Sequence, residues 1–459
     1  MVNAQRSWRR RSPLMSFLHS YRILLGAVLF SLLTAVFVAI HLGFFSTLLV
    51  YIPLVVICIP AFTAVEAADY KSMRAWPKRR RVRFALCAAW CAFLLLAPTY
   101  PSSGPSAFMN PRTPLPVLPS HTTTRAANGT ITATPARYFI AANLYDYSAH
   151  LPAWTGQLSR LIAHLGPENV FVSIYESNSH DATKDLLRVF ETQLNRAGVR
   201  NRVLLDEDGR RREGWQSNGH ERVQYMADMR NRALEPLKEE GVARRRFDKV
   251  LFFNDVYFDW KAIVRLLATK DGEFDLACGL DFDGIGLYDT WVIRDACGQR
   301  TKELWPYFSL SSDPAAVASL RRGAPVEVAT CWNGVAAFGA AWFAPEHALP
   351  LAFRADTPCP ESECFLIGYD MHLRSAPRRP RVYVNPRVEV AYTPHTYLYY
   401  ASLKHLSLTR PWRVVWEDWI AHRIFGWVAD YYWLTPKAGE RCAFEEEGIV
   451  KAGWCAKEL

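Results

Sequence analysis

Residues 247–264 read FDKVLFFNDVYFDWKAIV. The apolar run Val250–Phe253 predicts a buried strand, and it ends abruptly at Asn254-Asp255. A carboxylate at the tip of an apolar strand is typical of a ligand-binding edge, although an Asn-Asp pair also starts ordinary turns. The rest of the chain must decide between these two interpretations.

Strands and helices alternate on both sides of this stretch. Strands are predicted at 137–140, 169–175 and 202–205, and helices at 182–198 and 221–241. This alternation predicts an α/β domain whose mainly parallel central sheet is covered by helices on both faces. Ligands collect at the carboxyl ends of such strands, so Asn254, Asp255 and Glu176, which ends the strand 169–175, are expected at one edge.

The charge of the chain is concentrated near its amino terminus. Of its formal net charge of +10, the whole excess lies in residues 1–99, which hold twelve Lys or Arg and only two acids. Residues 100–459 hold equal numbers of basic and acidic residues, so they give no sign of the basic face that binding to nucleic acid requires. We therefore expect no nucleic acid among the partners.

The basic residues flank apolar segments that predict a membrane anchor. Residues 23–65 contain no Asp, Glu, Lys or Arg, and this length allows two spans, about 23–41 and 44–65. A third span, 84–98, follows the basic run 78–83. The positive-inside rule places the tail 1–22 in the cytoplasm and the chain beyond the spans on the far side of the membrane. The alternative is a single bent anchor, with 44–65 lying along the membrane surface.

A linker and a tail border the lumenal domain. Residues 99–136 are rich in Pro, Ser and Thr, which predicts a stalk, and Asn128 lies in the glycosylation sequon Asn128-Gly129-Thr130. We expect the main folded domain at 137–400 and an aromatic helical extension at 401–459. The aromatic stretch 411–433 either packs on the domain, which we favour, or lies in the membrane interface.

Cysteine usage fits an oxidising compartment. Seven cysteines follow the predicted spans and none forms a CxxC pair, so disulfides are expected rather than zinc. The sequence does not determine the pairing, in which Cys442 with Cys455 is the single pair we favour.

Five motifs occur in order after the spans. They are FFNDVYF (252–258), ACGLDF (277–282), YDTWVIRDACG (288–298), CWNG (331–334) and ESECF (361–365). Together they resemble the fungal capsule-associated α-1,3-mannosyltransferases, the cryptococcal mannosyltransferase family (glycosyltransferase family 69). This resemblance implies a GT-A-type fold, GDP-mannose as the donor, a mannoside or polysaccharide acceptor, a divalent cation, and retention of the anomeric configuration.

The resemblance and the chemistry of the donor agree on a metal site. A sugar nucleotide loses a charged diphosphate, and a divalent cation on both phosphates stabilises it. Hard cations prefer oxygen ligands, and Mn²⁺ also accepts an imidazole. We predict that Asp255 and His395 bind Mn²⁺. The sequence reads Phe253-Asn254-Asp255, so it keeps only the last acid of the Asp-x-Asp motif of GT-A enzymes.

The other motif residues are assigned by position and by the resemblance. The predicted donor-binding residues are Asn143, Glu176, Arg222, Arg230, Asn231, Asn254 and Asp283. The predicted catalytic acids are Glu363, Glu361 and Asp281. The predicted acceptor-binding residues are Asp289, Trp291, Arg294, Asp295, Trp332 and Asn333.

Several assignments have a structural alternative, which for His395 is a surface loop after Pro394. Glu361 and Glu363 fit the first turn of a helix, the two tryptophans fit a core, and Arg222 fits a solvated basic face. For the whole chain, the alternatives are a non-catalytic glycan-binding or polysaccharide assembly factor and, less favoured, a metal-dependent hydrolase.

Overall fold

The computed structural model describes residues 115–118, 122–125, 131–205, 219–239, 242, 246–284, 286–308, 313–344, 350–356, 361–375 and 378–405. All belong to one compact unit, residues 97–459. The predicted tail, the three spans, Asn128, Cys442, Cys455 and the stretch 411–433 lie outside the described residues. Within those residues, every helix is too short or too polar to cross a bilayer.

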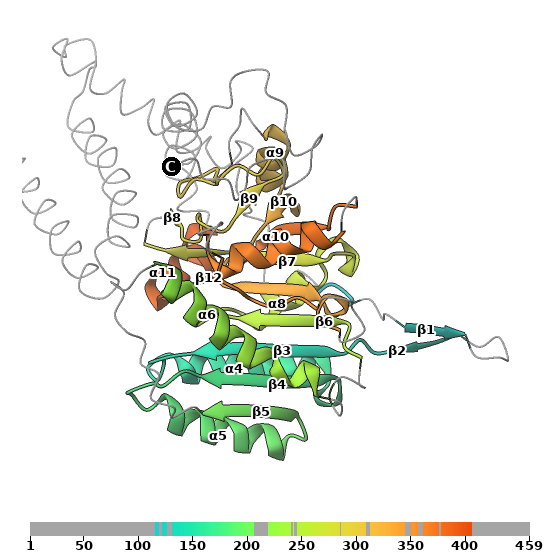
Figure 1. The fold of residues 1–459 in the computed structure, drawn as a ribbon, viewed down its shortest axis with the longest axis vertical. Helices are drawn as coiled ribbons and strands as arrows, with labels where there is room; N and C mark the ends of the chain where they lie inside the picture. Colours follow the sequence, from blue (N-terminus) through green and yellow to red (C-terminus); the bar gives the residue numbers. More distant parts are fainter. Residues whose placement is uncertain are drawn as a thin grey trace, which may run out of the picture. The chain divides into compact units, whose positions relative to one another are not determined.

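One large sheet organises the unit (Figure 1). Its strand order is β5-β4-β3-β6-β11-β7-β12-β10-β9, and β8 pairs with β7. Its strands are β3 (Tyr138–Leu144), β4 (Val170–Glu176), β5 (Arg200–Leu205), β6 (Lys249–Phe253), β7 (Leu276–Asp283), β8 (Gly286–Leu287), β9 (Arg294–Asp295), β10 (Val326–Thr330), β11 (Val335–Gly339) and β12 (Val382–Ala391). A separate hairpin pairs β1 (Thr122–Arg125) with β2 (Ile131–Thr134).

The sheet is mixed, so the prediction of a mainly parallel sheet is corrected. The four strands β5, β4, β3 and β6 are mutually parallel, as the alternation predicts. Next to them β11 runs antiparallel to both β6 and β7, and β10 runs antiparallel to β12 and β9. Strand periodicity reports which residues are buried but not which way a strand runs, so the sequence pattern could not reveal this reversal.

The antiparallel insertion of β11 matters for the site. Its first residue, Val335, pairs with Phe253, the last residue of β6. The turn before β11 therefore lies at the carboxyl end of β6, where the Asn254 amide donates to the Gly334 carbonyl (2.9 Å). The CWNG and FFND motifs meet at one edge of the sheet.

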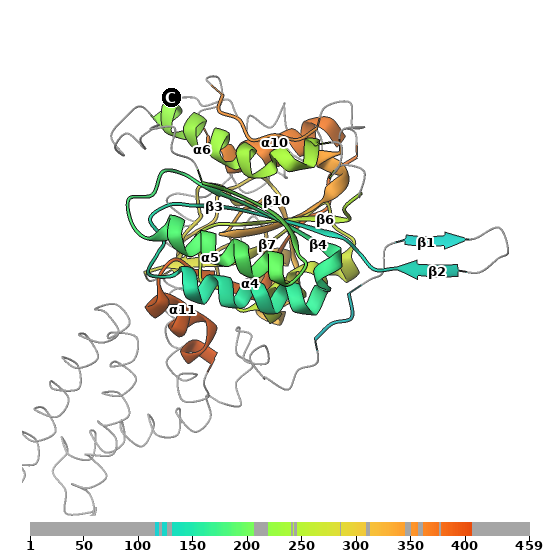
Figure 2. The same ribbon diagram turned by 90° about the horizontal axis from the view of Figure 1, so that it is seen from below.

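Helices cover both faces of the sheet. The helices are α4 (Leu151–Leu165), α5 (Thr183–Arg196), α6 (Gly219–Leu234), α8 (Trp260–Leu267), α9 (Pro314–Arg322), α10 (Glu363–Ser375) and α11 (Pro394–Ala401). Short 3₁₀ turns span Pro167–Asn169, Glu235–Lys238, Thr269–Gly272, Ala340–Phe343 and Leu403–His405. Figure 2 shows α6 and α10 on one side of the sheet and α4 and α5 on the other.

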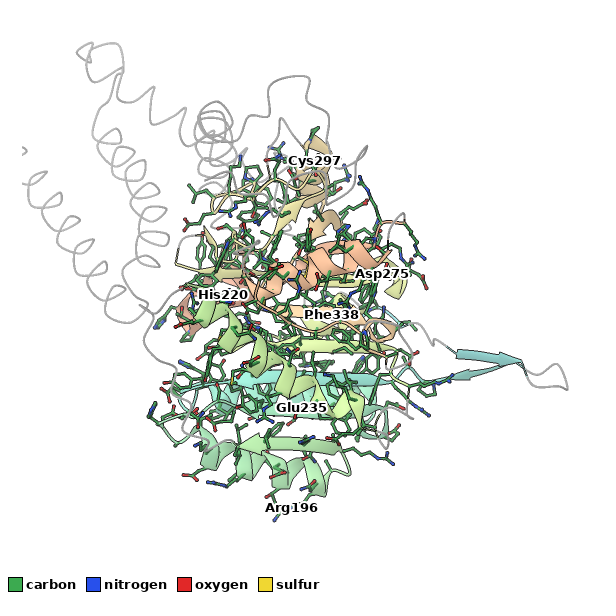
Figure 3. All side chains as sticks on the ribbon, viewed as in Figure 1. Arg196, His220, Glu235, Asp275, Cys297 and Phe338 are labelled. Carbon is green, nitrogen blue, oxygen red and sulfur yellow. A yellow bond between two sulfur atoms is a disulfide. The ribbon has the colours of Figure 1, made fainter. Side chains whose placement is uncertain are left out.

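The helices bury the apolar faces that their residue spacing predicts. In α4, Trp154, Leu158 and Leu165 recur at helical spacing and are buried. In α8, the Asp259 side chain caps the amino end by accepting from the Lys261 amide (2.7 Å). The strands supply the rest of the core; Phe338 of β11, labelled in Figure 3, is fully buried within the sheet.

A disulfide joins β7 to the turn that precedes β11. Cys278 and Cys331 are bonded and buried, and they lie 53 residues apart in the sequence. Cys297 is also disulfide-bonded, whereas Cys364 is a free, buried thiol. The bond tethers Cys331, and with it the neighbouring Trp332, to a central strand.

Removing this crosslink is expected to destabilise the domain. A crosslink that closes a loop of this length restricts the unfolded chain, so the paired variant Cys278→Ala/Cys331→Ala should lose about 2–5 kcal/mol of unfolding free energy. Denaturant unfolding under non-reducing conditions measures the loss. An unfolding free energy equal to that of the wild type would show that the crosslink contributes nothing.

Candidate active site

A pocket of about 300 Å³ opens at the carboxyl ends of β3 and β6. Its walls come from segments that are distant in the sequence: two strand ends, helix α6, the segment after β8, the turn after β10, the start of α10 and the end of β12. The lining residues are Asn143, Tyr145, Ser177, Arg222, Val223, Tyr225, Met226, Arg230, Asn254, Asp255, Tyr288, Asp289, Trp291, Val292, Trp332, Ser362, Glu363, Cys364 and Tyr392.

Asn254 connects three walls of the pocket. Its Oδ1 accepts from Arg230 Nη1 (2.9 Å) and from Trp332 Nε1 (3.2 Å). Its Nδ2 donates to the Tyr392 hydroxyl (3.2 Å). Because these bonds occupy its amide, Asn254 organises the pocket, and the neighbouring Asp255 supplies the half-buried carboxylate that lines it.

Arg230 and Glu363 form a buried ion pair in the pocket wall. Arg230 Nε donates to Glu363 Oε1 (3.0 Å), and both side chains are less than a tenth exposed. The Arg230 guanidinium also lies over the Trp332 ring, 4.6 Å from its centre. Burial opposes the charge on Arg230, but nearby Cys364 and Glu363 outweigh it and raise the pKa of Arg230 above its ordinary value. Arg230 is therefore a buried cation whose ion-pair partner is Glu363.

A second network joins two carboxyl groups behind and beside the pocket. Asp281 is fully buried on β7 and accepts from Asn333 Nδ2 (3.0 Å) and the Tyr392 hydroxyl (3.3 Å). Asp289 lines the pocket and accepts from the Asn333 amide (3.2 Å). Burial raises the pKa of both carboxyl groups, and Asp281 raises that of Asp289 further. The charge of Asp281 thus disfavours ionisation of Asp289.

Asn333 adopts a backbone conformation that suits this bridging position. Its φ is 51°, in the left-handed region that Asn tolerates, and Gly334 follows at 72°. This turn directs the Asn333 side chain to Asp281 and its amide to Asp289. The two acids are thereby fixed relative to each other.

Several predicted site residues have structural partners instead of a place on the pocket lining. Glu361 pairs with Arg300 (3.0 Å) and Arg294 (3.5 Å). Asp295 caps a turn by accepting from the amides of Cys297 and Gln299.

Three further predicted donor contacts also lie off this lining. Asn231 bonds the backbone of Phe353 through both of its side-chain atoms. Glu176 is fully buried, where it accepts from the Ser179 amide and lies 3.8 Å from Lys184. Asp283 is exposed at the end of β7.

The predicted metal ligands differ in their positions. Asp255 lines the pocket, whereas His395 is exposed in the first turn of α11 and is not part of the lining that the structure describes. Among the described residues, no three His, Cys, Asp or Glu side chains gather closely enough to bind a cation alone. A Mg²⁺- or Mn²⁺-type site needs only one or two carboxylates when substrate phosphates complete the shell, so Asp255 fits a cation held jointly with a substrate.

Some pocket residues were not identified from the sequence. Tyr392, which bonds Asn254 and Asp281, directly follows β12 and was identifiable as a strand-end polar residue. Tyr145 and Ser177 follow β3 and β4 in the same way. Tyr288 lies within the YDTWVIRDACG motif, but an aromatic residue next to an apolar strand is typical of a buried core position.

The sequence profile of one protein family, Cryptococcal mannosyltransferase 1, matches residues 137–370 of this chain. The chain belongs to this family. The matched segment contains every residue of the pocket lining except Tyr392. The prediction of the cryptococcal mannosyltransferase family, and with it of a glycosyltransferase at family level, is confirmed.

A named member of the family is similar over part of its length. The chain is 31% identical over 278 residues to the alpha-1,3-mannosyltransferase CMT1 of Cryptococcus neoformans var. neoformans. The alignment covers 56% of this chain and 58% of that protein, so the chain spans little more than half of its relative.

Solved structures are more distant. The mannosyltransferase PcManGT of Pyrobaculum calidifontis, in complex with GDP-Man and Mn²⁺, aligns at 13% identity and a TM-score of 0.33, covering 67% of this chain and 66% of that one. Staphylococcus aureus TarS in complex with UDP aligns at 12% identity and a TM-score of 0.32, covering 57% and 63%. These scores are too low to support any argument about the site.

Proposed function

We propose that this chain transfers mannose from GDP-mannose to a mannoside or polysaccharide acceptor, with Mn²⁺ as cofactor and an α-1,3 linkage as the product. The observation that carries the proposal is the family match, because it spans nearly the whole pocket lining. The chemistry of the lining supports the proposal, since carboxylates, arginines and aromatic rings gather at the carboxyl ends of the strands.

The donor diphosphate would be bound between Asp255 and helix α6. Arg222 is exposed at the pocket and projects from the same helix as Arg230. Arg230 is buried in the pocket wall, whereas Arg222 is exposed on the lining, so we assign the contact with phosphate oxygens to Arg222. Asp255 would hold the cation, which supplies charge neutralisation for the departing diphosphate.

Two acids of the pocket are suited to different tasks. Glu363 forms an ion pair with Arg230 in the pocket wall, and we assign its carboxylate to stabilising positive charge that develops on the mannose ring. Asp289 has a raised pKa, so it can hold the proton that leaves the acceptor hydroxyl. Asp281 and Asn333 position Asp289, and we assign them no direct contact with the sugar.

A panel of sugar nucleotides tests this function on the full chain in detergent. We expect transfer to a mannoside only with GDP-mannose, loss of transfer with EDTA, and recovery when Mn²⁺ is added back. Equal turnover of UDP-sugars would contradict the assigned donor. Full activity in EDTA would contradict the cofactor.

The second candidate function is a glycan-binding or polysaccharide assembly factor without turnover. It is favoured by the sequence Phe253-Asn254-Asp255, in which one acid of Asp-x-Asp is missing. It predicts that the chain binds mannosides but releases no GDP from GDP-mannose. The same panel therefore decides between the two functions.

We also propose that the enzyme is a multi-pass protein of the Golgi membrane with its catalytic domain in the lumen. Replacing Asn128 by Gln in the expressed full chain is then expected to abolish the mobility shift that an endoglycosidase causes in the wild-type chain. Gel electrophoresis before and after enzyme treatment measures this. A wild-type chain that carries no glycan at Asn128 would remove this support for a lumenal domain.

A further inference from the structure

Two exposed aromatic rings flank the pocket. Among the large apolar side chains that the described residues expose, the aromatic ones are Tyr288, at 53%, and Trp291, at 39%. Both line the pocket. Aromatic rings are usually buried because they carry large apolar surfaces, so two exposed rings at one pocket indicate a binding surface.

The backbone beneath these rings is fixed. The Tyr288 amide donates to the Asp281 carbonyl (3.0 Å), and the next amide, of Asp289, donates to Asp281 Oδ1 (3.3 Å). The Trp291 carbonyl accepts from the buried Arg294 side chain. Exposed rings on a fixed backbone lose little conformational entropy when a ligand covers them, so this segment is prepared for binding.

These anchoring bonds give roles to residues that lie off the pocket lining. Arg294 lies over the Phe365 ring (4.6 Å to its centre) and pairs with Glu361, which also binds Arg300. Arg294 thus holds the Trp291 backbone in place through its carbonyl, and Glu361 holds Arg294. They are positioning residues for the segment 288–291.

The polar group between the rings matches one class of ligand. Asp289 lies between Tyr288 and Trp291 in the sequence and lines the same pocket. A sugar ring has an apolar face of C–H groups, which packs on the electron-rich face of an aromatic ring, and a rim of hydroxyls, which bonds carboxyl groups. A pocket wall that carries two aromatic rings and a carboxyl group therefore suits a saccharide.

The segment 288–291 lies on a different wall of the pocket from the end of β3. Asn143 lies near the end of β3 and Tyr145 follows it, whereas Tyr288 is anchored on β7, and β6 and β11 lie between these strands. Three strand spacings correspond to about 14 Å, which leaves room for a donor and an acceptor side by side.

We propose that Tyr288 and Trp291 form a stacking platform for a sugar ring of the acceptor, with Asp289 bonding its hydroxyls. This assignment rests on the proposed function, because it places the acceptor beside the mannosyl donor. The occupant is the acceptor saccharide; the guanine base of the donor is the alternative that the experiment excludes.

The test uses Tyr288→Ala and Trp291→Ala in the full chain, with Tyr288→Phe and Trp291→Phe as variants that retain a ring. The acceptor probe is an α-linked mannobiose. Each Ala variant should raise the KM for mannobiose about tenfold, as the loss of one aromatic contact implies. The Phe variants should stay within about twofold of the wild type.

Two donor measurements are made on the same variants: the KM for GDP-mannose and the slow release of GDP without an acceptor. Both should remain at wild-type values. Val189→Ala, which trims an exposed apolar side chain on α5, serves as the control and should change none of these parameters.

The proposal is overturned if the Ala variants leave the KM for mannobiose unchanged, or if the loss falls equally on GDP-mannose, which would assign the rings to the nucleotide. If the wild type does not turn over GDP-mannose, the proposed function fails and calorimetric titration with mannobiose tests the platform alone. In that titration, weaker binding by the Ala variants supports the platform, and equal binding overturns it.

Discussion

Replacing Asp255 by Asn is expected to lower the rate of mannosyl transfer by about a thousandfold or more, since the variant loses the carboxylate that holds the cation. The side chain keeps its size and half-buried position, so the fold should be retained. Transfer of radiolabelled mannose from GDP-mannose, with thermal unfolding alongside, measures both properties. The remaining activity should no longer respond to Mn²⁺ or to EDTA.

Asp185→Asn is the matched control for this experiment. Asp185 is a strongly exposed carboxylate on α5, and among the described residues it forms an ion pair with Arg188 (2.7 Å). Exposed ion pairs of this kind contribute little, so its removal should change neither activity nor stability measurably. An Asp255→Asn variant as active as the Asp185→Asn control would show that Asp255 is not the metal ligand.

The second large effect is expected at Arg230, whose replacement by Met should destabilise the domain by about 3–5 kcal/mol and abolish transfer. The change leaves the Glu363 carboxylate buried without its cation, and the cost of such a group is of this size. It also removes a donor to Asn254 and the cation over Trp332. Denaturant unfolding measures the stability, and the transfer assay measures the activity.

The double variant Arg230→Met/Glu363→Met separates stability from catalysis. Replacing both charges by apolar side chains removes the uncompensated carboxylate, so most of the stability should return. Transfer should stay abolished, because Glu363 is proposed to stabilise charge on the mannose ring. A double variant that regains transfer would assign Arg230 and Glu363 a structural role only.

Arg232→Met, on the same helix, is the control for both variants. Arg232 is partly exposed and pairs with Glu235 (3.4 Å), so its loss should alter stability by less than about 0.5 kcal/mol. A loss as large as that of Arg230→Met would show that the helix, and not the buried pair, is sensitive to substitution.

The sequence predicted the site best where side chains follow strands. The rule that polar residues at the ends of parallel strands meet at one edge placed Asn254, Asp255 and Glu176 together; the pocket contains Asn254 and Asp255, whereas Glu176 is buried and lies off the lining. Helical spacing also worked, because Arg222 and Arg230 are eight residues apart and both line the pocket. Asn231, one residue on, is turned about 100° around the helix and bonds Phe353 instead.

Other features could not be predicted because they depend on tertiary arrangement. Glu361 and Glu363 are two residues apart, yet α10 begins at Glu363, and the two acids pair with different arginines. The reversed direction of β11 brings Trp332 and Asn333 to the end of β6, and only the sheet pairing reveals it. The Cys278–Cys331 bond likewise depends on which strands lie side by side.

The central claim is that Asp255 binds a cation together with the donor diphosphate, and titration of Mn²⁺ into the purified full chain tests it most directly. Electron paramagnetic resonance of free Mn²⁺ is followed with and without GDP, in the wild type and in Asp255→Asn. The account predicts tight Mn²⁺ binding only when GDP and Asp255 are both present. Equal Mn²⁺ binding by the Asp255→Asn variant in the presence of GDP would contradict it.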